Sequence, residues 1–333
     1  LTPATFSGAI DTVGNNANRN ATSALVALNM LGAAPLSASA LADQFEDATG
    51  EVDVTVEVPA EQWAPRWPAD HVTLPERLLF VDGVRRVDAQ VWFDDGGITR
   101  AGVCASVAAG SVHCADGVAS VLDVVVERGF FARSSPHAGP IDTHHGTYQY
   151  VALPEDGPPA VNQGMQDLMT DVEVSIAAGH DVDLVVYDGP LRQRNDPRAV
   201  GYVKTQHVQY LPDELQAMVG RLEAGQRTPL FLMGGRGTRY SWYLRLPGPR
   251  PQPMAGVVRC EVMADRVADA AARADTITAT LPRYASEAHK DPRAPQNLYP
   301  IAGLEHRLRH LLGDQQLMER ALRRAAAGTL STG

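Results

Sequence analysis

The chain has 333 residues, of which 44% are hydrophobic, so it is long enough for one large domain or two modest ones with a substantial core. Its formal net charge of −10 argues against a protein that coats nucleic acid through a basic surface, so any contact with nucleic acid must be local. The three cysteines lack CxxC spacing, which argues against a structural zinc site and favours free thiols in a reducing cytoplasm.

The N-terminal part, residues 1–75, is expected to form an extension. Residues 1–50 are rich in alanine and leucine and offer Asn20 and Ser37 as helix N-caps, which predicts a helical segment. Residues 58–75 contain four prolines and two tryptophans, and proline at that density opposes both a helix and a central strand. We interpret this stretch as a connector whose tryptophans pack back on the body of the protein.

The main domain is expected to begin at residue 76 with strands. The stretch 78–97 alternates in hydrophobicity and ends in the turn signal Asp-Asp-Gly-Gly, and similar runs follow over 98–114 and 118–132. These runs predict an antiparallel meander. The period changes over 160–178, where apolar residues recur at the spacing of one helix face.

The second half of the domain, which ends at residue 326, alternates between strands and helices. The stretch 182–191 contains an unbroken apolar run, which is typical of a buried strand. The remaining predicted segments are a strand over 198–211, a helix over 212–225, strand and Gly-rich loop over 227–248, the last strand and helices within 255–270 and 301–325, and a flexible tail over 327–333.

This order of elements favours a ribonuclease H-like fold. Such a fold is an α/β structure, in which a mixed sheet is flanked by helices, here with an N-terminal helical extension. In folds of this kind a carboxylate on the first strand, one on the first helix and one that ends the fourth strand meet around two metal ions.

Two segments give the strongest functional signal. LLFVDGVRR (78–86) and VDLVVYDGP (182–190) each contain an apolar run that ends in Asp-Gly, which predicts Asp82 and Asp188 at the carboxyl edge of the sheet. Adjacent carboxylates repel each other unless they are protonated or neutralised by a divalent metal. A single Asp-Gly pair is more often only a turn, but two such strand ends favour a metal site.

The helix between these strands is expected to supply a third carboxylate. Its candidates are Asp167, Asp171 and Glu173. On a helical wheel Asp167 lies on the polar side, whereas Asp171 and Glu173 flank the buried stripe on opposite edges, so the wheel does not choose between these two. We prefer Glu173 because its side chain reaches further.

Carboxylates in this arrangement suit phosphodiester hydrolysis. Two divalent ions about 3.5–4 Å apart can hold both the attacking and the leaving oxygen. Hard oxygen ligands favour Mn²⁺ or Mg²⁺ over softer metals, so two ions of this kind are the expected cofactors.

Several arginines are candidates for contact with DNA. Arg192 and Arg194 closely follow Asp188 and can guide a phosphate backbone, or they can belong to a solvated loop. Arg236 and Arg239 lie in a Gly-rich stretch that precedes three aromatic residues and can grip phosphates, or the stretch can be a strand with a core of aromatics. The stretch lacks the spacing of a phosphate-binding P-loop, which argues against ATP binding there.

From about residue 76 to 325 the chain resembles the NurA nuclease family. The resemblance lies in LLFVDGVRR, in MQDLMTDVE, in VDLVVYDGPLRQRNDPRAVGYVKT (182–205) and in the late segment DPRAPQNLYPIAGLEHRLRHLLGD. It implies a PIWI-related, ribonuclease H-like domain with manganese-dependent nuclease activity on DNA. It also implies a homodimer that works with a hexameric HerA-type ATPase in DNA end processing.

The resemblance also assigns residues. It implies that Asp82, Glu173 and Asp188 are the catalytic metal ligands, and that Lys204 contacts phosphate, although a solvated lysine at the end of a strand is an equal alternative. The family often carries a further ligand, a histidine on a helix that follows Tyr-Pro.

Homology and the helical wheel disagree about that fourth ligand. Homology favours His306, which follows Tyr299-Pro300. The wheel favours Glu305, which borders the apolar stripe of the predicted helix. Both residues are retained as candidates.

The sequence therefore predicts a metal-dependent DNA nuclease. One alternative is a non-catalytic adaptor that clamps DNA or docks on the ATPase, and another is a metal-dependent phosphohydrolase of small molecules. No apolar run is long enough to cross a membrane, so no membrane partner is expected.

Overall fold

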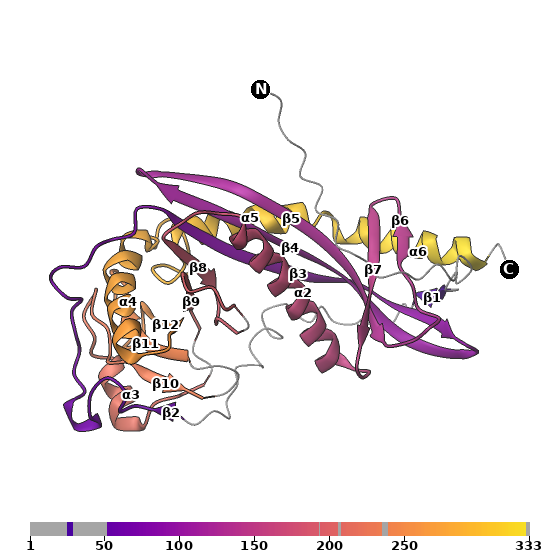
Figure 1. Cartoon of the computed structure of the whole chain (residues 1–333). Helices are drawn as coiled ribbons and strands as arrows, with labels where there is room; N and C mark the ends of the chain where they lie inside the picture. Colours follow the sequence, from indigo (N-terminus) through magenta and orange to yellow (C-terminus); the bar gives the residue numbers. More distant parts are fainter. Residues whose placement is uncertain (1–24, 29–51, 193, 206–207, 235–238, 331–333) are drawn as a thin grey trace.

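The computed structural model describes residues 25–28 and 52–330 except 193, 206–207 and 235–238. These residues form a mixed α/β structure around one large sheet of 12 strands, with the order β2-β10-β11-β12-β9-β8-β3-β4-β5-β7-β6 and β1 paired to β3 (Figure 1). The strands are β1 (Leu25–Leu28), β2 (Val52–Asp53), β3 (Leu78–Asp95), β4 (Ile98–Ala115), β5 (Val118–Arg133), β6 (Ile141–Thr143), β7 (Gly146–Leu153), β8 (Leu184–Asp188), β9 (Ala199–Val203), β10 (Phe231–Met233), β11 (Arg239–Arg245) and β12 (Val257–Met263).

Helices cover both faces of this sheet. The α-helices are α2 (Pro158–Ala178), α3 (Asp213–Val219), α4 (Val267–Thr280), α5 (Tyr299–Leu311) and α6 (Gln315–Leu330), with short 3-10 turns η1 (Ala60–Gln62) and η2 (Leu281–Tyr284). Helix α2 crosses one side of the long strands β3, β4 and β5, and α5 and α6 run along the other side (Figure 1).

The long strands form the predicted antiparallel meander, because two tight turns reverse the chain. Gly96 (φ 64°) and Gly97 (φ 92°) connect β3 to β4, and Asp116 (φ 52°) and Gly117 (φ 74°) connect β4 to β5. Two-residue hairpin turns of this hand need positive φ at both positions, which Gly and Asp tolerate best.

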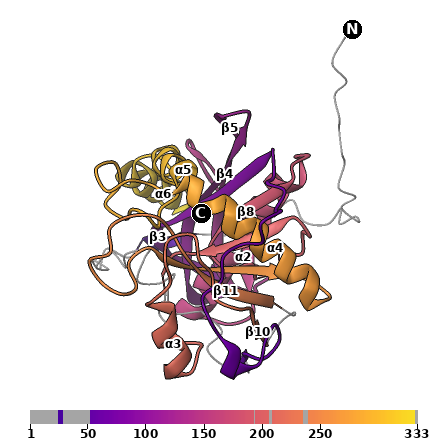
Figure 2. The ribbon, with the colours of Figure 1, turned by 90° about the vertical axis from the view of Figure 1, so that its left-hand side faces the viewer.

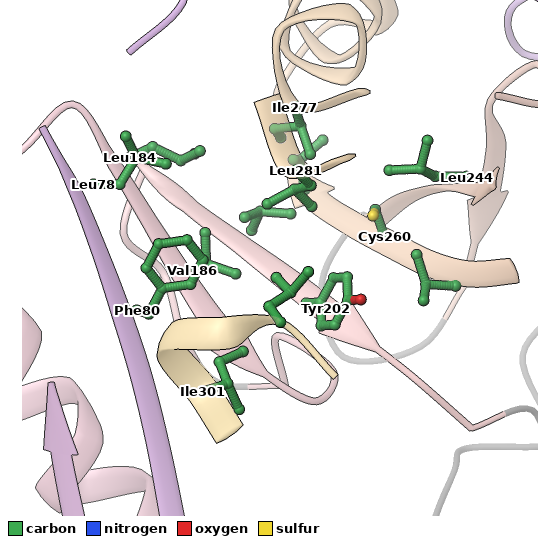
Figure 3. Close-up of a cluster of buried hydrophobic side chains, with 14 of the residues drawn as sticks. Leu78, Phe80, Leu184, Val186, Tyr202, Leu244, Cys260, Ile277, Leu281 and Ile301 are labelled. Atoms are coloured by element: carbon green, nitrogen blue, oxygen red, sulfur yellow. The ribbon is translucent and has the colours of Figure 1, made fainter. Parts of the chain in front are cut away.

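Strand β3 shows why the two faces have separate cores. Leu78 and Phe80 point to the face covered by α4 and α5, whereas Leu79 and Val81 point to the opposite face. This is the period-2 alternation of a strand that is buried on both sides. In Figure 3, Phe80 and Val186 lie close to Ile301 of α5 in the first of these cores.

The centre of the sheet places the candidate carboxylates. Strand β8 pairs in parallel with both β3 and β9, and β12 pairs antiparallel with β9. The chain reaches β8 from β7 through α2, since a parallel connection needs a crossover of this kind. The carboxyl ends of β8 and β9 therefore lie level with Asp82, near the start of the long strand β3.

Four of the expected element boundaries are wrong. Residues 25–28 are a strand paired with Val91–Phe93 of β3, not a helix, because an unpaired edge of β3 is available there. The rest of the helical segment expected over 1–50 lies outside the described residues. The strand expected over 198–211 ends at Val203, and the helix expected over 212–225 ends at Val219. Helix α6 continues to Leu330, into the expected tail, because its alanines favour helix.

The connector packs back on the body mainly through Trp63. This side chain packs against the apolar cluster that includes Leu211 and Val219, and its indole nitrogen donates to the carbonyl oxygen of Val54 at 2.7 Å. Trp67 is 58% exposed and lies beside Gly225. The amide of Ala69 donates to Asp275 of α4, and Figure 2 shows the indigo connector running beside that helix. Among the described residues, no helix is long and apolar enough to cross a membrane.

Candidate active site

Asp82 and Asp188 lie next to each other on neighbouring strands. Val81 of β3 is paired with Tyr187 of β8, so the next residue on each strand is one of these aspartates. Asp82 is 5% exposed. Its Oδ1 accepts a hydrogen bond from the amide of Gly83, and its Oδ2 is buried without a hydrogen-bond partner among the described residues.

The two Asp-Gly pairs have different roles. Strand β8 ends at Asp188 and Gly189 (φ 109°) turns the chain away, as expected. The expectation that the first strand also ends at Asp82 is wrong, because β3 continues through Gly83 to Asp95. A Cβ at Gly83 would lie 2.5 Å from Glu173 Oε1, so this glycine allows a helix carboxylate to approach the strand backbone.

Glu173 is thereby the helix residue that reaches the strand pair. It is 1% exposed, whereas Asp171 is exposed on the same helix. Arg194 donates to Glu173 Oε2 and also to the carbonyl oxygen of Pro190, and its guanidinium lies 4.7 Å from the ring centre of Tyr187. Arg194 therefore neutralises Glu173 in this structure.

Electrostatics connects four carboxylates in this region. Burial raises the pKa of Asp82 well above its usual value, and the charges of Asp188, Glu173 and Glu305 raise it further, while Lys204 opposes them. Burial also raises the pKa of Glu173 against the opposing effect of Arg194. Asp82 and Glu173 are therefore stabilised by a bound proton or by a cation placed next to them.

Basic side chains already neutralise three of these carboxylates. Lys204 Nζ lies 2.6 Å from Asp188 Oδ2, Arg194 pairs with Glu173, and Arg293 pairs with Glu305. Within the described part of the chain, no three Asp, Glu, His or Cys side chains are arranged as a ready metal cluster. The all-carboxylate donor set and the unpartnered Asp82 Oδ2 nevertheless fit a hard divalent cation in their chemistry.

The fourth position is better matched by Glu305 than by His306. The charge of Glu305 acts on Asp82, and its own pKa is held below the usual value because hydrogen bonds from Arg293 and Arg309 outweigh the effect of burial. His306, the next residue on α5, is exposed.

The candidate DNA-binding residues lie in different environments. Lys204 sits at the carboxylates, and Arg192, with φ 46°, is close enough for its charge to act on Glu173. Arg239 is 6% exposed, and its Nη1 lies 3.5 Å from Glu261 Oε2 on the neighbouring strand β12, so its side chain is buried against the sheet. Arg236 lies outside the described residues.

The sequence reasoning missed the residues that hold Lys204. Its Nζ donates to Asn297 Oδ1 at 3.0 Å, and the buried Asn297 in turn donates to Asp291 Oδ2 at 2.6 Å. Arg293 from the same loop pairs with Glu305. The only signal for this loop was its place in the late segment DPRAPQNLYP, which carries no pattern that indicates ion pairing.

The raised pKa of Asp82 leads to a prediction on stability. In the unfolded chain the pKa of an aspartate is about 3.9, whereas in the folded protein the pKa of Asp82 is higher, so Asp82 keeps its proton to higher pH. Above the unfolded pKa the folded state thus binds more protons, so we expect this residue to lower the free energy of unfolding as pH rises through the folded pKa. Asp82→Asn should flatten this dependence.

Thermal melts of metal-free protein between about pH 4 and about pH 8 measure this effect. Mn²⁺ should raise the melting temperature of the wild type more at the upper end, because the ion competes with protons. Asp171→Asn, at an exposed position of α2, is the control. An equal pH dependence in wild type and Asp82→Asn would contradict the assignment.

Comparison with known proteins yields limited similarity. No protein-family model and no curated protein matches the chain. Among solved structures, the NurA nuclease from Sulfolobus solfataricus is similar with a TM-score of 0.44 and 12% identity, over 75% of this chain and 84% of that one. Endonuclease V from Bacillus subtilis is similar with a TM-score of 0.33 and 12% identity, over 74% and 86% of the two chains. The function therefore has to be inferred from the side chains themselves.

Proposed function

We propose that this chain is a metal-dependent nuclease that hydrolyses phosphodiester bonds of DNA. The observation that carries the proposal is the pair Asp82 and Asp188 at adjacent positions of two strands, with an unpartnered carboxylate oxygen buried between charged neighbours. Carboxylates held so close together in a buried place destabilise a fold unless they bind a cation or a proton.

Asp82, Glu173 and Asp188 would hold Mn²⁺ or Mg²⁺, and Glu305 would be the fourth carboxylate. Two such ions, when bound, would activate water and stabilise the leaving oxygen of the phosphodiester. Ligation would require Glu173 and Asp188 to exchange their present partners, Arg194 and Lys204.

The basic residues have distinct roles in this proposal. Lys204, freed in part from Asp188, would bind a phosphate oxygen, and Asn297 would keep its ammonium at the site. Arg192 would contact the approaching backbone of the DNA strand. The role of Arg194 would be to balance the charge of Glu173 until a cation arrives.

The wider setting follows the family resemblance. The order β5-β4-β3-β8-β9, with β8 parallel to β3, supports a ribonuclease H-like, PIWI-related fold. A NurA-like protein of this kind would act as a homodimer with a HerA-type ATPase in DNA end processing. The three free, buried cysteines suit the cytoplasm.

The test is cleavage of end-labelled single- and double-stranded DNA by the purified full chain, with Mn²⁺, with Mg²⁺ and with EDTA. Cutting that needs the metal supports the proposal. Absence of cutting with either metal, also after addition of a HerA-type ATPase, would sink it. Cleavage of bis-nitrophenyl phosphate but not of DNA would point to a small-molecule phosphohydrolase.

A second function, a non-catalytic adaptor, is favoured by the ion pairs at the site. Lys204, Arg194 and Arg293 already neutralise Asp188, Glu173 and Glu305, as would suit a site that has no metal to bind. Calorimetric titration with Mn²⁺ discriminates between the two. A nuclease should bind Mn²⁺ with loss of binding in Asp82→Asn, whereas an adaptor should show no heat that depends on Asp82.

A further inference from the structure

Arg85 is a basic residue next to the candidate site that no function discussed above uses. It follows Gly83 by two residues on β3, and because side chains alternate along a strand, both residues belong to the same face of the sheet. Helix α2 covers that face, and its Glu173 packs against Gly83. At about 3.3 Å per residue, the backbone of Arg85 lies about 7 Å beyond that of Gly83. Arg85 is therefore a neighbour of the candidate carboxylates on the side of α2.

The side chain of Arg85 reaches α2 but has no acidic partner there. Its Nη1 donates to the carbonyl oxygen of Asn162 at 3.2 Å. In the part of the chain that the structure describes, no carboxylate acts on the charge of Arg85. A guanidinium has five N–H groups, so four of them are left for a ligand or for water. Arg85 is partly exposed, so a ligand can reach it from outside.

A second arginine places another positive charge beside Arg85. Burial lowers the pKa of Arg85, and the charge of Arg192, in the loop that follows β8, lowers it further. Arg192 also acts on Glu173, and like Arg85 it is partly exposed. Two guanidinium groups that are close enough to repel each other are stabilised by an anion that lies between them. The position of these two arginines therefore favours the binding of an anion.

The carboxylate of Glu173 does not balance these charges. Glu173 is 1% exposed and already pairs with Arg194. The group on this face thus has three arginines, Arg85, Arg192 and Arg194, against one carboxylate, which leaves an excess of two positive charges. This excess is opposite in sign to the net charge of −10 of the whole chain, so it is a local feature. A local positive charge in an acidic protein indicates a specific anionic ligand.

Lys204 lies on a different side of the carboxylates. Asp82 alternates with its neighbours along β3, so it belongs to the face that α5 covers, and Asp188 is next to it on β8. Lys204 contacts Asp188 and also Asn297, which comes shortly before α5. Arg85, by contrast, contacts α2. The lysine and the pair of arginines are therefore suited to two different anionic groups.

We propose that Arg85 and Arg192 form a subsite for a phosphate group of the substrate, separate from the phosphate at Lys204. A guanidinium binds two phosphate oxygens through parallel N–H···O bonds, which an ammonium does not do. A phosphodiester of a DNA strand, next to the one that is cut, matches a position beside the carboxylates. That the phosphate belongs to DNA rests on the proposed function, whereas the binding of a phosphate group does not depend on it.

The experiment is the salt dependence of oligo(dT) binding to the full chain in EDTA, where no metal-dependent cleavage occurs. Each phosphate contact with a single strand contributes about 0.7 to the slope of log K against log salt concentration. Arg85→Gln should reduce this slope by about 0.7 and weaken binding about tenfold at low salt. An unchanged slope in the folded variant would overturn the proposal, and so would failure of the wild type to bind oligo(dT).

Matched variants separate a phosphate contact from a structural role of Arg85. Arg266→Gln makes the same change at an exposed position of α4 and should leave both the slope and the affinity unchanged. Arg85→Lys keeps the charge but loses the planar guanidinium, so it should restore the slope and only part of the affinity. Thermal melts show whether each variant is folded. A slope that falls equally in Arg266→Gln and Arg85→Gln would contradict the assignment.

Two further comparisons identify the source of the phosphate and separate the subsite from the nuclease. Inorganic phosphate, titrated by calorimetry at constant ionic strength, is the second probe. Phosphate binding that depends on Arg85, with no effect of Arg85→Gln on oligo(dT), would assign the subsite to free phosphate and overturn its place on a DNA strand. Failure to cut DNA together with a reduced slope in Arg85→Gln would contradict the nuclease but keep the subsite. Cleavage together with an unchanged slope would do the reverse.

Discussion

Replacement of Asp188 by Asn is expected to lower metal-dependent DNA cleavage by about a thousandfold or more. Asp188 lies at the carboxyl end of β8, adjacent to Asp82, and it is the partner of Lys204. Stabilisation of transition-state charge by metal ions contributes several kcal/mol, and each 1.36 kcal/mol is a factor of ten in rate. The variant keeps the shape of the side chain, so the loss should come from the charge.

Initial rates of cleavage of end-labelled DNA with saturating Mn²⁺ measure this effect. Asp171→Asn makes the same chemical change at an exposed position of α2 and should keep nearly full activity. Thermal melts of both variants should show that the fold persists. If Asp188→Asn cuts DNA within a factor of ten of the wild type, Asp188 is not a ligand and the site assignment is wrong.

The largest loss of stability is expected for Arg227→Ala. The side chain of Arg227 is 3% exposed and lies between two carboxylates from distant segments. Its Nε donates to Asp275 of α4 at 2.7 Å, and its two terminal nitrogens donate to Glu57 at 3.0 and 2.9 Å. Burial raises the pKa of Glu57, but Arg227, together with the amide of Leu230 and the charge of Arg66, outweighs this effect and holds that pKa below its usual value.

Removal of one partner from a buried ion pair costs about 3–5 kcal/mol, because the other charge stays buried without compensation. Glu57 would then retain only Arg66 and the amide of Leu230. Urea unfolding measures the change in free energy. Arg266→Ala removes an exposed partner of Asp269 and serves as the control, for which no measurable change is expected. A loss below about 1 kcal/mol for Arg227→Ala would contradict the role assigned to this pair.

Hydrophobic patterns predicted the elements near the site well. The alternation over 78–97 and the helical spacing over 160–178 correspond to β3 and α2, because each pattern follows directly from which face is buried. Boundaries in the second half were less accurate. The polar stretch after Val203 carries no periodic signal, so the ends of β9 and α3 depended on contacts with other segments.

The sequence by itself determined that Asp82 and Asp188 each follow a run of buried apolar strand residues and that a helix with Glu173 lies between them in the chain, because these features depend only on neighbouring residues. Only the tertiary structure decided that the side chain of Glu173 packs against Gly83, where the sequence predicted a turn. It also decided that Lys204 neutralises Asp188 and that Arg194 neutralises Glu173. It also brought Gln209 and Gln216, Gln252, and Gln296, from three stretches of the chain, around one cavity. Ion pairs and cavities arise from the packing of residues distant in the chain, and no local pattern encodes which of those residues meet.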